Sequence, residues 1–169
     1  YTILDNYRKS HLQAAGIQIK CDNSVTSIYS FYFPPRHGIK CEDYDLFFRN
    51  LGTKFIVGGD FNAKHPWWGS RTTNPKGKEL YKSLIKNNLS VLSTGRPTYW
   101  PTDPRKIPDL LDFIVYSNIP SYLLDILDSD EHSRREINLK HSFDVMSGFL
   151  KSQSFVLSFV ATVSKSDIH

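Results

Sequence analysis

The sequence has 169 residues, of which 40% are hydrophobic and 14% aromatic, so it is long enough for one packed domain and too short for two ordinary ones. The 21 Lys and Arg residues outnumber the 17 Asp and Glu, and the net charge of +4 suits a polyanionic partner without requiring one. Two distant cysteines, Cys21 and Cys41, indicate neither a disulfide framework nor a zinc site and favour a reducing, intracellular setting.

The first third of the chain predicts a hairpin followed by a helix. Two runs rich in Ile, Val, Tyr and Phe lie within residues 16–33, separated by the turn-prone sequence CDNS. The second run ends at Pro34-Pro35, where the missing N–H group and the fixed φ stop ladder pairing. Residues 40–52 have acidic residues near the start, Gly52 at the end, and apolar side chains at helical spacing, namely Tyr44, Phe47, Phe48 and Leu51.

The middle of the chain alternates strands and helices. The sequence KFIVGGD, residues 54–60, is a short apolar run typical of a strand buried on both faces. Residues 77–89 predict a surface helix, because lysines separate the apolar residues Leu80, Leu84 and Ile85. A brief strand at 89–93, an ordered loop with several prolines and an apolar strand at 110–117 follow. This order predicts an α/β layered fold, whereas residues 134–169 show no clear pattern.

The sequence GGDFN, where the apolar strand ends, combines two glycines with two polar residues. Functional side chains in α/β sheets collect just beyond the carboxyl ends of strands, where Asp60 lies. Gly58 and Gly59 permit unusual backbone angles and a close approach of a ligand. On extended backbone, Asp60 and Asn62 face the same side while Phe61 points into the core. A carboxylate that can accept a proton from water then lies beside a carboxamide that can donate to a phosphate oxygen. The ordinary alternative is that both residues form a turn.

Three other places carry candidate site residues. Asp112 lies in an apolar strand, and a buried carboxylate is costly unless it is paired, so a cationic or imidazole partner is expected. The sequence DSDEHS brings Asp130 close to His132, and a carboxylate that orients a histidine is a common catalytic unit, with an exposed acidic loop as the alternative. Tyr32 ends the hairpin, where its phenol could reach a ligand or simply pack.

In this order, the sequences YFPP, GGDFNAKHPWWGSR, PTYWP, PDLLDF and DSDEHS resemble the endonuclease/exonuclease/phosphatase superfamily. More narrowly, they are similar to the apurinic-type endonuclease domain of jockey-like non-LTR retrotransposons. The resemblance implies a DNase I-like, layered α/β sandwich of two packed mixed sheets with outer helices, here without its first strands. Residues 1–133 would form a partial endonuclease domain, and residues 134–169 a divergent C-terminal tail.

The resemblance also implies roles for individual residues. Asp60 would orient or deprotonate the attacking water, and Asn62 beside it would hold the scissile phosphate. Tyr32 matches the tyrosine on the phosphate side of the site. Asp112 matches the carboxylate that aligns the catalytic histidine, and His132 would stabilise the charged phosphorane.

Metal binding is the part of the pattern from which the sequence departs. Asp130 would lie on the metal side, where Mg²⁺ or Mn²⁺ neutralises charge on the phosphate and the leaving oxygen. The family's principal metal-binding Glu belongs to strands that precede Tyr1, so weak metal binding is expected. Glu131 separates Asp130 from His132, and one inserted residue turns a side chain to the opposite face of an extended segment.

The implied function is metal-dependent hydrolysis of phosphodiester bonds in DNA, the nick that primes retrotransposon insertion, in a nuclear polyprotein that also carries a reverse transcriptase. Basic residues in the flanking loops could track DNA, chiefly Arg71, Arg105 and Lys64, with Lys76 in the same set. Trp67, Trp68 and Trp100 could stack on bases, although at least two are expected to pack. One alternative is an inactive remnant that at most binds nucleic acid, and another is a phosphatase acting on phosphoinositides or other phosphodiesters.

Overall fold

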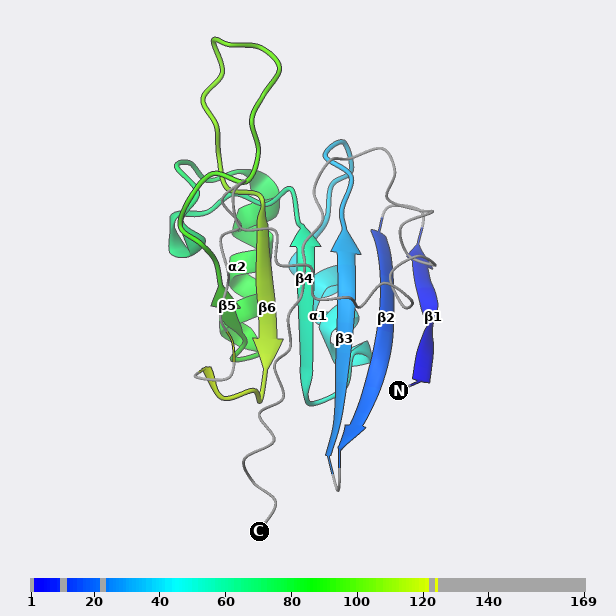
Figure 1. Ribbon diagram of the computed structural model, residues 1–169. Helices are drawn as coiled ribbons and strands as arrows, with labels where there is room; N and C mark the ends of the chain where they lie inside the picture. Colours follow the sequence, from blue (N-terminus) through cyan, green and yellow to red (C-terminus); the bar gives the residue numbers. More distant parts are fainter. Residues whose placement is uncertain (1, 10–11, 22–23, 122–123, 125–169) are drawn as a thin grey trace, which may run out of the picture. The chain divides into compact units, whose positions relative to one another are not determined.

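The computed structural model describes residues 2–9, 12–21, 24–121 and 124. The described strands form one mixed sheet of six strands in the order β1-β2-β3-β4-β6-β5, and both helices lie behind the same face of it (Figure 1). The elements are β1 (Thr2–Lys9), β2 (Leu12–Cys21), β3 (Ser24–Tyr32), α1 (Cys41–Asn50), β4 (Phe55–Asp60), the 3₁₀ turn η1 (Pro66–Trp68), α2 (Pro75–Lys86), β5 (Ser90–Leu92) and β6 (Asp112–Ser117). None of the described helices has the length and apolar character needed to cross a membrane.

The predicted α/β fold is confirmed, with one of the two expected sheets present among the described residues. β2 and β3 form the predicted antiparallel hairpin, β3 and β4 pair in parallel across α1, and β6 pairs antiparallel with β4. From the sequence, the first strand was placed within residues 16–33 and β1 was missed, because Asp5 and Asn6 interrupt the apolar pattern of β1. The register of β1 against β2 shifts between Leu4 and Tyr7, which places this interruption in a bulge.

The core lies between the sheet and the helices and is rich in aromatic rings. The ring of Phe61 stacks 4.5 Å from Phe31 and 4.4 Å from Phe113, so neighbouring strands are joined by packed aromatic rings. The four predicted apolar positions of α1 are all buried. On α2, Leu80 and Leu84 are buried as predicted, but Ile85 is 55% exposed, so its assignment to the buried face was wrong.

The two helices are joined by a buried carboxylate on α1. Asp45 is only 4% exposed, and its oxygens accept hydrogen bonds from Ser83 Oγ at 2.6 Å and Asn87 Nδ2 at 2.7 Å. Lys86 Nζ lies 2.6 Å from the same carboxylate. Because these three contacts run from α2 and its C-cap to α1, Asp45 fixes how the helices pack against one another.

We predict that Asp45→Ala lowers the free energy of unfolding by about 1–3 kcal/mol, because the buried Ser83 hydroxyl and the half-buried Asn87 amide lose the carboxylate that accepts their hydrogen bonds. Denaturant unfolding measures this change. Glu42→Ala is the matched control on the exposed side of α1, and its effect should be within about 1 kcal/mol. Equal losses in the two variants would contradict the role given to Asp45.

Gly59 allows β3 and β4 to approach closely just below the end of the sheet. Its φ of +148° is one that glycine adopts readily, and a Cβ atom at this position would overlap the carbonyl oxygen of Phe31 on β3. The unusual backbone expected for the glycine pair is therefore found at Gly59. The group that approaches it is the neighbouring strand, so this glycine serves the strand pairing that positions the site.

We predict that Gly59→Ala destabilises the chain by roughly 2–4 kcal/mol, because the added methyl group forces β3 and β4 apart and strains the backbone. Gly38→Ala is the matched control, since a Cβ atom there meets nothing within 4 Å. Thermal unfolding of both variants measures the difference. A Gly59→Ala protein as stable as Gly38→Ala would show that the strands tolerate the methyl group.

Candidate active site

Three predicted site residues lie side by side at one end of the sheet. Tyr32 is the partner of Asp60 in the β3–β4 register, and Asp60 is the partner of Asp112 in the β4–β6 register. This is the end at which the arrows of β3 and β4 finish in Figure 1. Residues on either side of this row, such as Phe31 and Phe113, are buried in the aromatic core. Because side chains alternate along strands, Tyr32, Asp60 and Asp112 share the face opposite the helices.

Asn62 is held against Asp60 by a tight turn. Its backbone N–H donates to Asp60 Oδ1 at 2.7 Å, and its side-chain amide donates to Asp60 Oδ2 at 2.9 Å and to the carbonyl of Phe33 at 3.0 Å. The expected extended backbone is wrong here, since Asn62 has a φ of +47°. The two side chains meet nonetheless, and Phe61 points into the core as predicted. Both amide hydrogens are donated within the chain, so Asn62 reaches a phosphate only by exchanging one of these bonds.

The electrostatics of the row favour a proton acceptor near neutral pH. Burial and then the neighbouring charge of Asp112 raise the pKa of Asp60 to about 7, against the lowering effects of Asn62 and Lys76. Burial also raises the pKa of Asp112, partly offset by a hydrogen bond from Thr98. The pKa of the Tyr32 phenol is raised by burial and by Asp60. A carboxylate tuned in this way is suited to general base catalysis.

Thr98 is a site residue that sequence reasoning missed. Its hydroxyl oxygen accepts hydrogen bonds from the backbone N–H groups of Leu111 at 3.0 Å and Asp112 at 2.9 Å. It therefore holds the start of β6, and among the described residues it supplies the polar partner of Asp112 that was expected to be a cation or an imidazole. No sequence pattern marks this contact, because Thr98 lies in the long loop before β6.

The segment that follows Asn62 is fastened to the first turn of α2 by Asn74. The Asn74 amide donates to the Asn62 carbonyl at 3.0 Å, and its oxygen accepts from Lys64 N at 2.9 Å and from Gly77 N at 2.7 Å. As the N-cap of α2, Asn74 satisfies helix N–H groups at the same time. The side chain of Lys76, in the first turn of α2, is buried and lies against Phe33, whose carbonyl accepts from Asn62.

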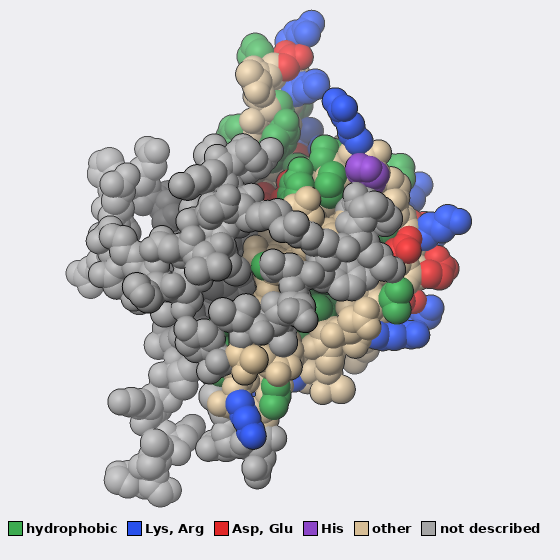
Figure 2. All heavy atoms as spheres, turned by 90° about the vertical axis from the view of Figure 1, so that its right-hand side faces the viewer, with side chains coloured by type: hydrophobic (Ala, Val, Ile, Leu, Met, Phe, Trp, Pro, Cys, Tyr) green, Lys and Arg blue, Asp and Glu red, His purple; other side chains and the backbone are tan. Residues whose placement is uncertain are grey.

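The residues expected to contact DNA occupy the loops beside this row. Lys64 Nζ pairs at 2.9 Å with Asp109, a buried carboxylate that also accepts the backbone N–H of Arg71 at 3.0 Å. Arg105 is exposed and donates twice to Asp103 of its own loop. Figure 2 shows Lys and Arg side chains among apolar and acidic ones at the end where the loop between β5 and β6 projects. The structure thus exposes Arg71 and Arg105, while Lys64 is partly neutralised.

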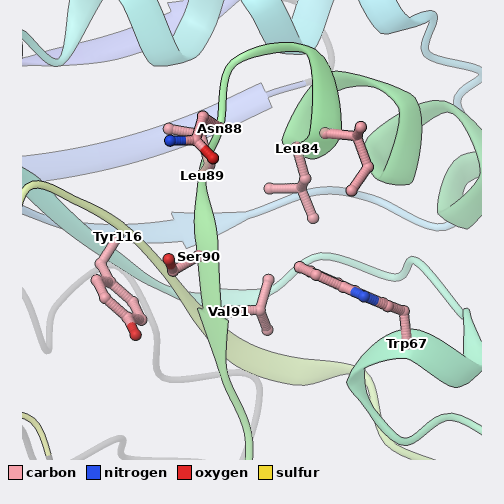
Figure 3. Close-up of a pocket in the computed structure, with 8 residues that line it drawn as sticks. Trp67, Leu84, Asn88, Leu89, Ser90, Val91 and Tyr116 are labelled. Atoms are coloured by element: carbon pink, nitrogen blue, oxygen red, sulfur yellow. The ribbon is translucent and has the colours of Figure 1, made fainter.

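The three tryptophans differ in exposure. Trp68 is buried and donates to the Ala63 carbonyl at 3.1 Å, as expected for packing, whereas Trp67 is 46% and Trp100 61% exposed. Trp67 lines a shallow groove beside edge strand β5, shown in Figure 3 with Leu84, Val91 and Tyr116. The groove residues carry no charge, so this groove lacks the groups needed for phosphate chemistry.

The described residues do not by themselves make a metal centre. No group of three or more His, Cys, Asp or Glu side chains gathers within the described ranges. Both oxygens of Asp60 already accept hydrogen bonds from Asn62. Asp130 and His132 lie outside the described residues, so the expected metal carboxylate and the expected catalytic histidine keep their status as predictions, as does the effect of Glu131.

Comparison with known proteins identifies the family of this chain. A family model described as endonuclease-reverse transcriptase matches residues 26–133, which is more than half of the chain. The chain belongs to this family. It is 34% identical over 114 residues to the RNA-directed DNA polymerase of the mobile element jockey from Drosophila melanogaster, with 68% of the chain covered. It is also 33% identical over 125 residues to the probable RNA-directed DNA polymerase of transposon BS from the same species, with 71% covered.

These comparisons confirm the resemblance to endonucleases of non-LTR retrotransposons. Among solved structures, the endonuclease domain of TRAS1, a telomere-specific non-LTR retrotransposon, matches with a TM-score of 0.53 and 27% identity, covering 70% of this chain and 54% of that one. The matched region spans only 12% and 14% of the jockey and BS proteins. Endonucleases of this superfamily generally depend on a divalent metal ion.

We predict that Asp112→Asn weakens the pH dependence of stability. A carboxyl group whose pKa is higher in the folded than in the unfolded chain binds more protons when folded, so stability falls as pH rises from the unfolded value toward the folded one. Removing the Asp112 charge also lowers the pKa of Asp60. The loss of unfolding free energy between about pH 5 and about pH 8 should shrink by on the order of 1 kcal/mol.

Asp103→Asn is the control for this measurement by thermal unfolding. Arg105 lowers the pKa of Asp103, so that carboxylate titrates below the pH range tested and its removal should leave the slope unchanged. An Asp112→Asn protein with the same slope as the original chain would show that the two carboxylates are not coupled.

Proposed function

We propose that this chain is an endonuclease domain that hydrolyses phosphodiester bonds in DNA and makes the nick at which its parent element inserts. The observation that carries the proposal is the row of Tyr32, Asp60 and Asp112 across three neighbouring strands, with the pKa of Asp60 raised to about 7. The match to retrotransposon proteins supports it. In the parent polyprotein a reverse transcriptase would accompany the domain, and the nucleus would be its place of action.

Asp60 is the group proposed to act on water. Half-ionised near neutral pH, it can accept a proton from a water molecule as the water attacks phosphorus. The Asn62 amide orients Asp60 through a hydrogen bond of 2.9 Å to the carboxylate. When a phosphate is bound, this amide can exchange one of its present hydrogen bonds for a bond to a phosphate oxygen. Tyr32, on the far side of Asp60 from Asp112, offers a phenol to the phosphate.

DNA is favoured as substrate over a phosphoinositide by the surroundings of the row. The loop between β5 and β6 exposes Tyr99, Trp100 and Ile107, and Arg105 lies on the same loop. Aromatic faces and Arg side chains together are suited to bases and backbone phosphates. Arg71, whose Nε donates to Pro108 at the base of this loop, lies on the same side. Stacking by Trp100 is therefore part of the proposed DNA contact.

Mg²⁺ or Mn²⁺ is the proposed cofactor, with Asp130 as a proposed ligand. The described residues do not fit a complete metal site, as both Asp60 oxygens are engaged and no third acidic or imidazole group joins the row there. The chemistry assigned above to Asp60, Asn62 and Tyr32 therefore concerns only their own protons and hydrogen bonds. His132 is proposed to complete the site from the segment that follows.

Nicking of supercoiled plasmid by the 169-residue chain, with Mg²⁺ or with a chelator, tests the function. We predict Mg²⁺-dependent nicking that falls by about 10²–10⁴-fold in Asp60→Asn, because the amide cannot accept the proton of water. Glu42→Gln, the same chemical change on exposed α1, should nick like the original chain.

Three results would overturn the proposal. Nicking that survives Asp60→Asn would place the activity elsewhere, and complete inactivity combined with salt-sensitive DNA binding would identify a binding remnant. Cleavage of a soluble phosphoinositide but not of DNA would support the phosphatase alternative.

A further inference from the structure

Lys76 is a buried cation beside the candidate active site. It is 7% exposed although it lies in the first turn of a helix, where a lysine side chain can ordinarily extend into water. Its Nζ donates to the carbonyl of Pro34 and lies 4.2 Å from the centre of the Phe33 ring. From the sequence, Lys76 was expected among the surface residues that could track DNA. The expected exposure was wrong, because the side chain is buried.

The surrounding structure leaves Lys76 little freedom to move elsewhere. Asn74 caps the helix and binds the backbone of Asn62 and Lys64, which ties the first turn of α2 to the segment after Asp60. A Cβ atom on Gly77 would overlap the carbonyl oxygen of Lys64, so this contact requires glycine. Asn74 before Lys76 and Gly77 after it therefore hold the first turn of α2 against the segment that follows Asp60.

Asp60 needs a nearby positive charge. From β6 it faces Asp112, a second carboxylate that opposes its ionisation, and from β3 it faces the phenol of Tyr32. From α2, Lys76 lies against Phe33, whose backbone N–H donates to the Asp60 carbonyl at 2.9 Å, and the positive charge of Lys76 favours the ionised Asp60 carboxylate. Burial lowers the pKa of Lys76 to about 8, and Asp60 opposes this lowering, so the two charges stabilise one another.

We propose that Lys76 is a positioning residue of the active site, whose buried ammonium group keeps the Asp60 carboxylate ionised beside Asp112. The inference rests on the proposed function, because it explains how Asp60 retains its capacity to accept a proton. Lys76 acts through Asp60 and needs no contact with the substrate. Its hydrogen bond to Pro34 and its contact with Phe33 hold the ammonium group in place.

A pair of substitutions separates the charge of Lys76 from its hydrogen bond. Lys76→Gln keeps a donor for the Pro34 carbonyl but removes the charge, whereas Lys76→Arg keeps both. Titration of the Asp60 carboxyl carbon by NMR, in the full chain with Asp60→Asn used for assignment, reports the pKa directly. We expect the pKa of Asp60 to rise by about one unit in Lys76→Gln and to stay near its original value in Lys76→Arg.

Lys78→Gln is the matched control, because Lys78 is exposed two residues along the same helix. It should leave the Asp60 titration unchanged. In nicking assays, the acid limb of the pH–rate profile should move upward by the same amount in Lys76→Gln, with activity recovered at higher pH and restored by Lys76→Arg.

An Asp60 titration that is the same in Lys76→Gln as in the original chain would overturn the inference. So would equal shifts in Lys76→Gln and Lys76→Arg, since the hydrogen bond or packing would then be the cause. The NMR result does not depend on nuclease activity. A shifted Asp60 pKa in a chain that never nicks DNA would support the link between Lys76 and Asp60 while overturning the proposed function.

Discussion

The register between β3, β4 and β6 is the constraint on which the site depends. On the helix side of the sheet, Phe31 and Phe113 pack against Phe61 just beyond the end of β4. A slip of one residue in any of these strands would move an aromatic ring to the opposite face and expose it to water. The same register places Asp60 between its neighbours Tyr32 and Asp112. Burial of aromatic side chains on one face thus determines which polar side chains meet on the other.

Two carboxylates of the described part of the chain, the buried Asp45 and the half-buried Asp60, differ in how well they are satisfied. Asp45 accepts bonds from Ser83, Asn87 and Lys86, and its pKa is lowered because these partners outweigh the cost of burial. Among the described residues, the Asp60 carboxylate accepts hydrogen bonds only from Asn62, and it has a like charge beside it and a raised pKa. A fully paired carboxylate stabilises a fold, whereas one that remains partly unpaired keeps its capacity to take a proton. This difference is a physical reason to assign structure to the first and chemistry to the second.

The loop between β5 and β6 joins the site to the surface proposed to meet DNA. At its base, Tyr99 bridges to Asp109, and Asp109 binds the backbone of Arg71 and the side chain of Lys64. Lys64 belongs to the segment that begins at Asp60, so the foot of the loop and the proton acceptor share one network. The exposed side chains of the loop are therefore carried on a base tied to the site, and under the proposed function this arrangement would hold a DNA strand next to Asp60.

Local patterns in the sequence determined most elements of the described fold and the chemistry of its best motif. Apolar periodicity predicted the hairpin, both helices and strands β4, β5 and β6, and the GGDFN sequence singled out Asp60 and Asn62. Periodicity reports which face of an element is buried, but it does not report which distant side chains meet there. The contact of Thr98 with Asp112, the clamp made by Asn74 and the burial of Lys76 beside Asp60 were therefore decided only by the tertiary structure. Each joins segments far apart in the chain, where the energy of a buried hydrogen bond or charge depends on packing rather than on neighbouring residues.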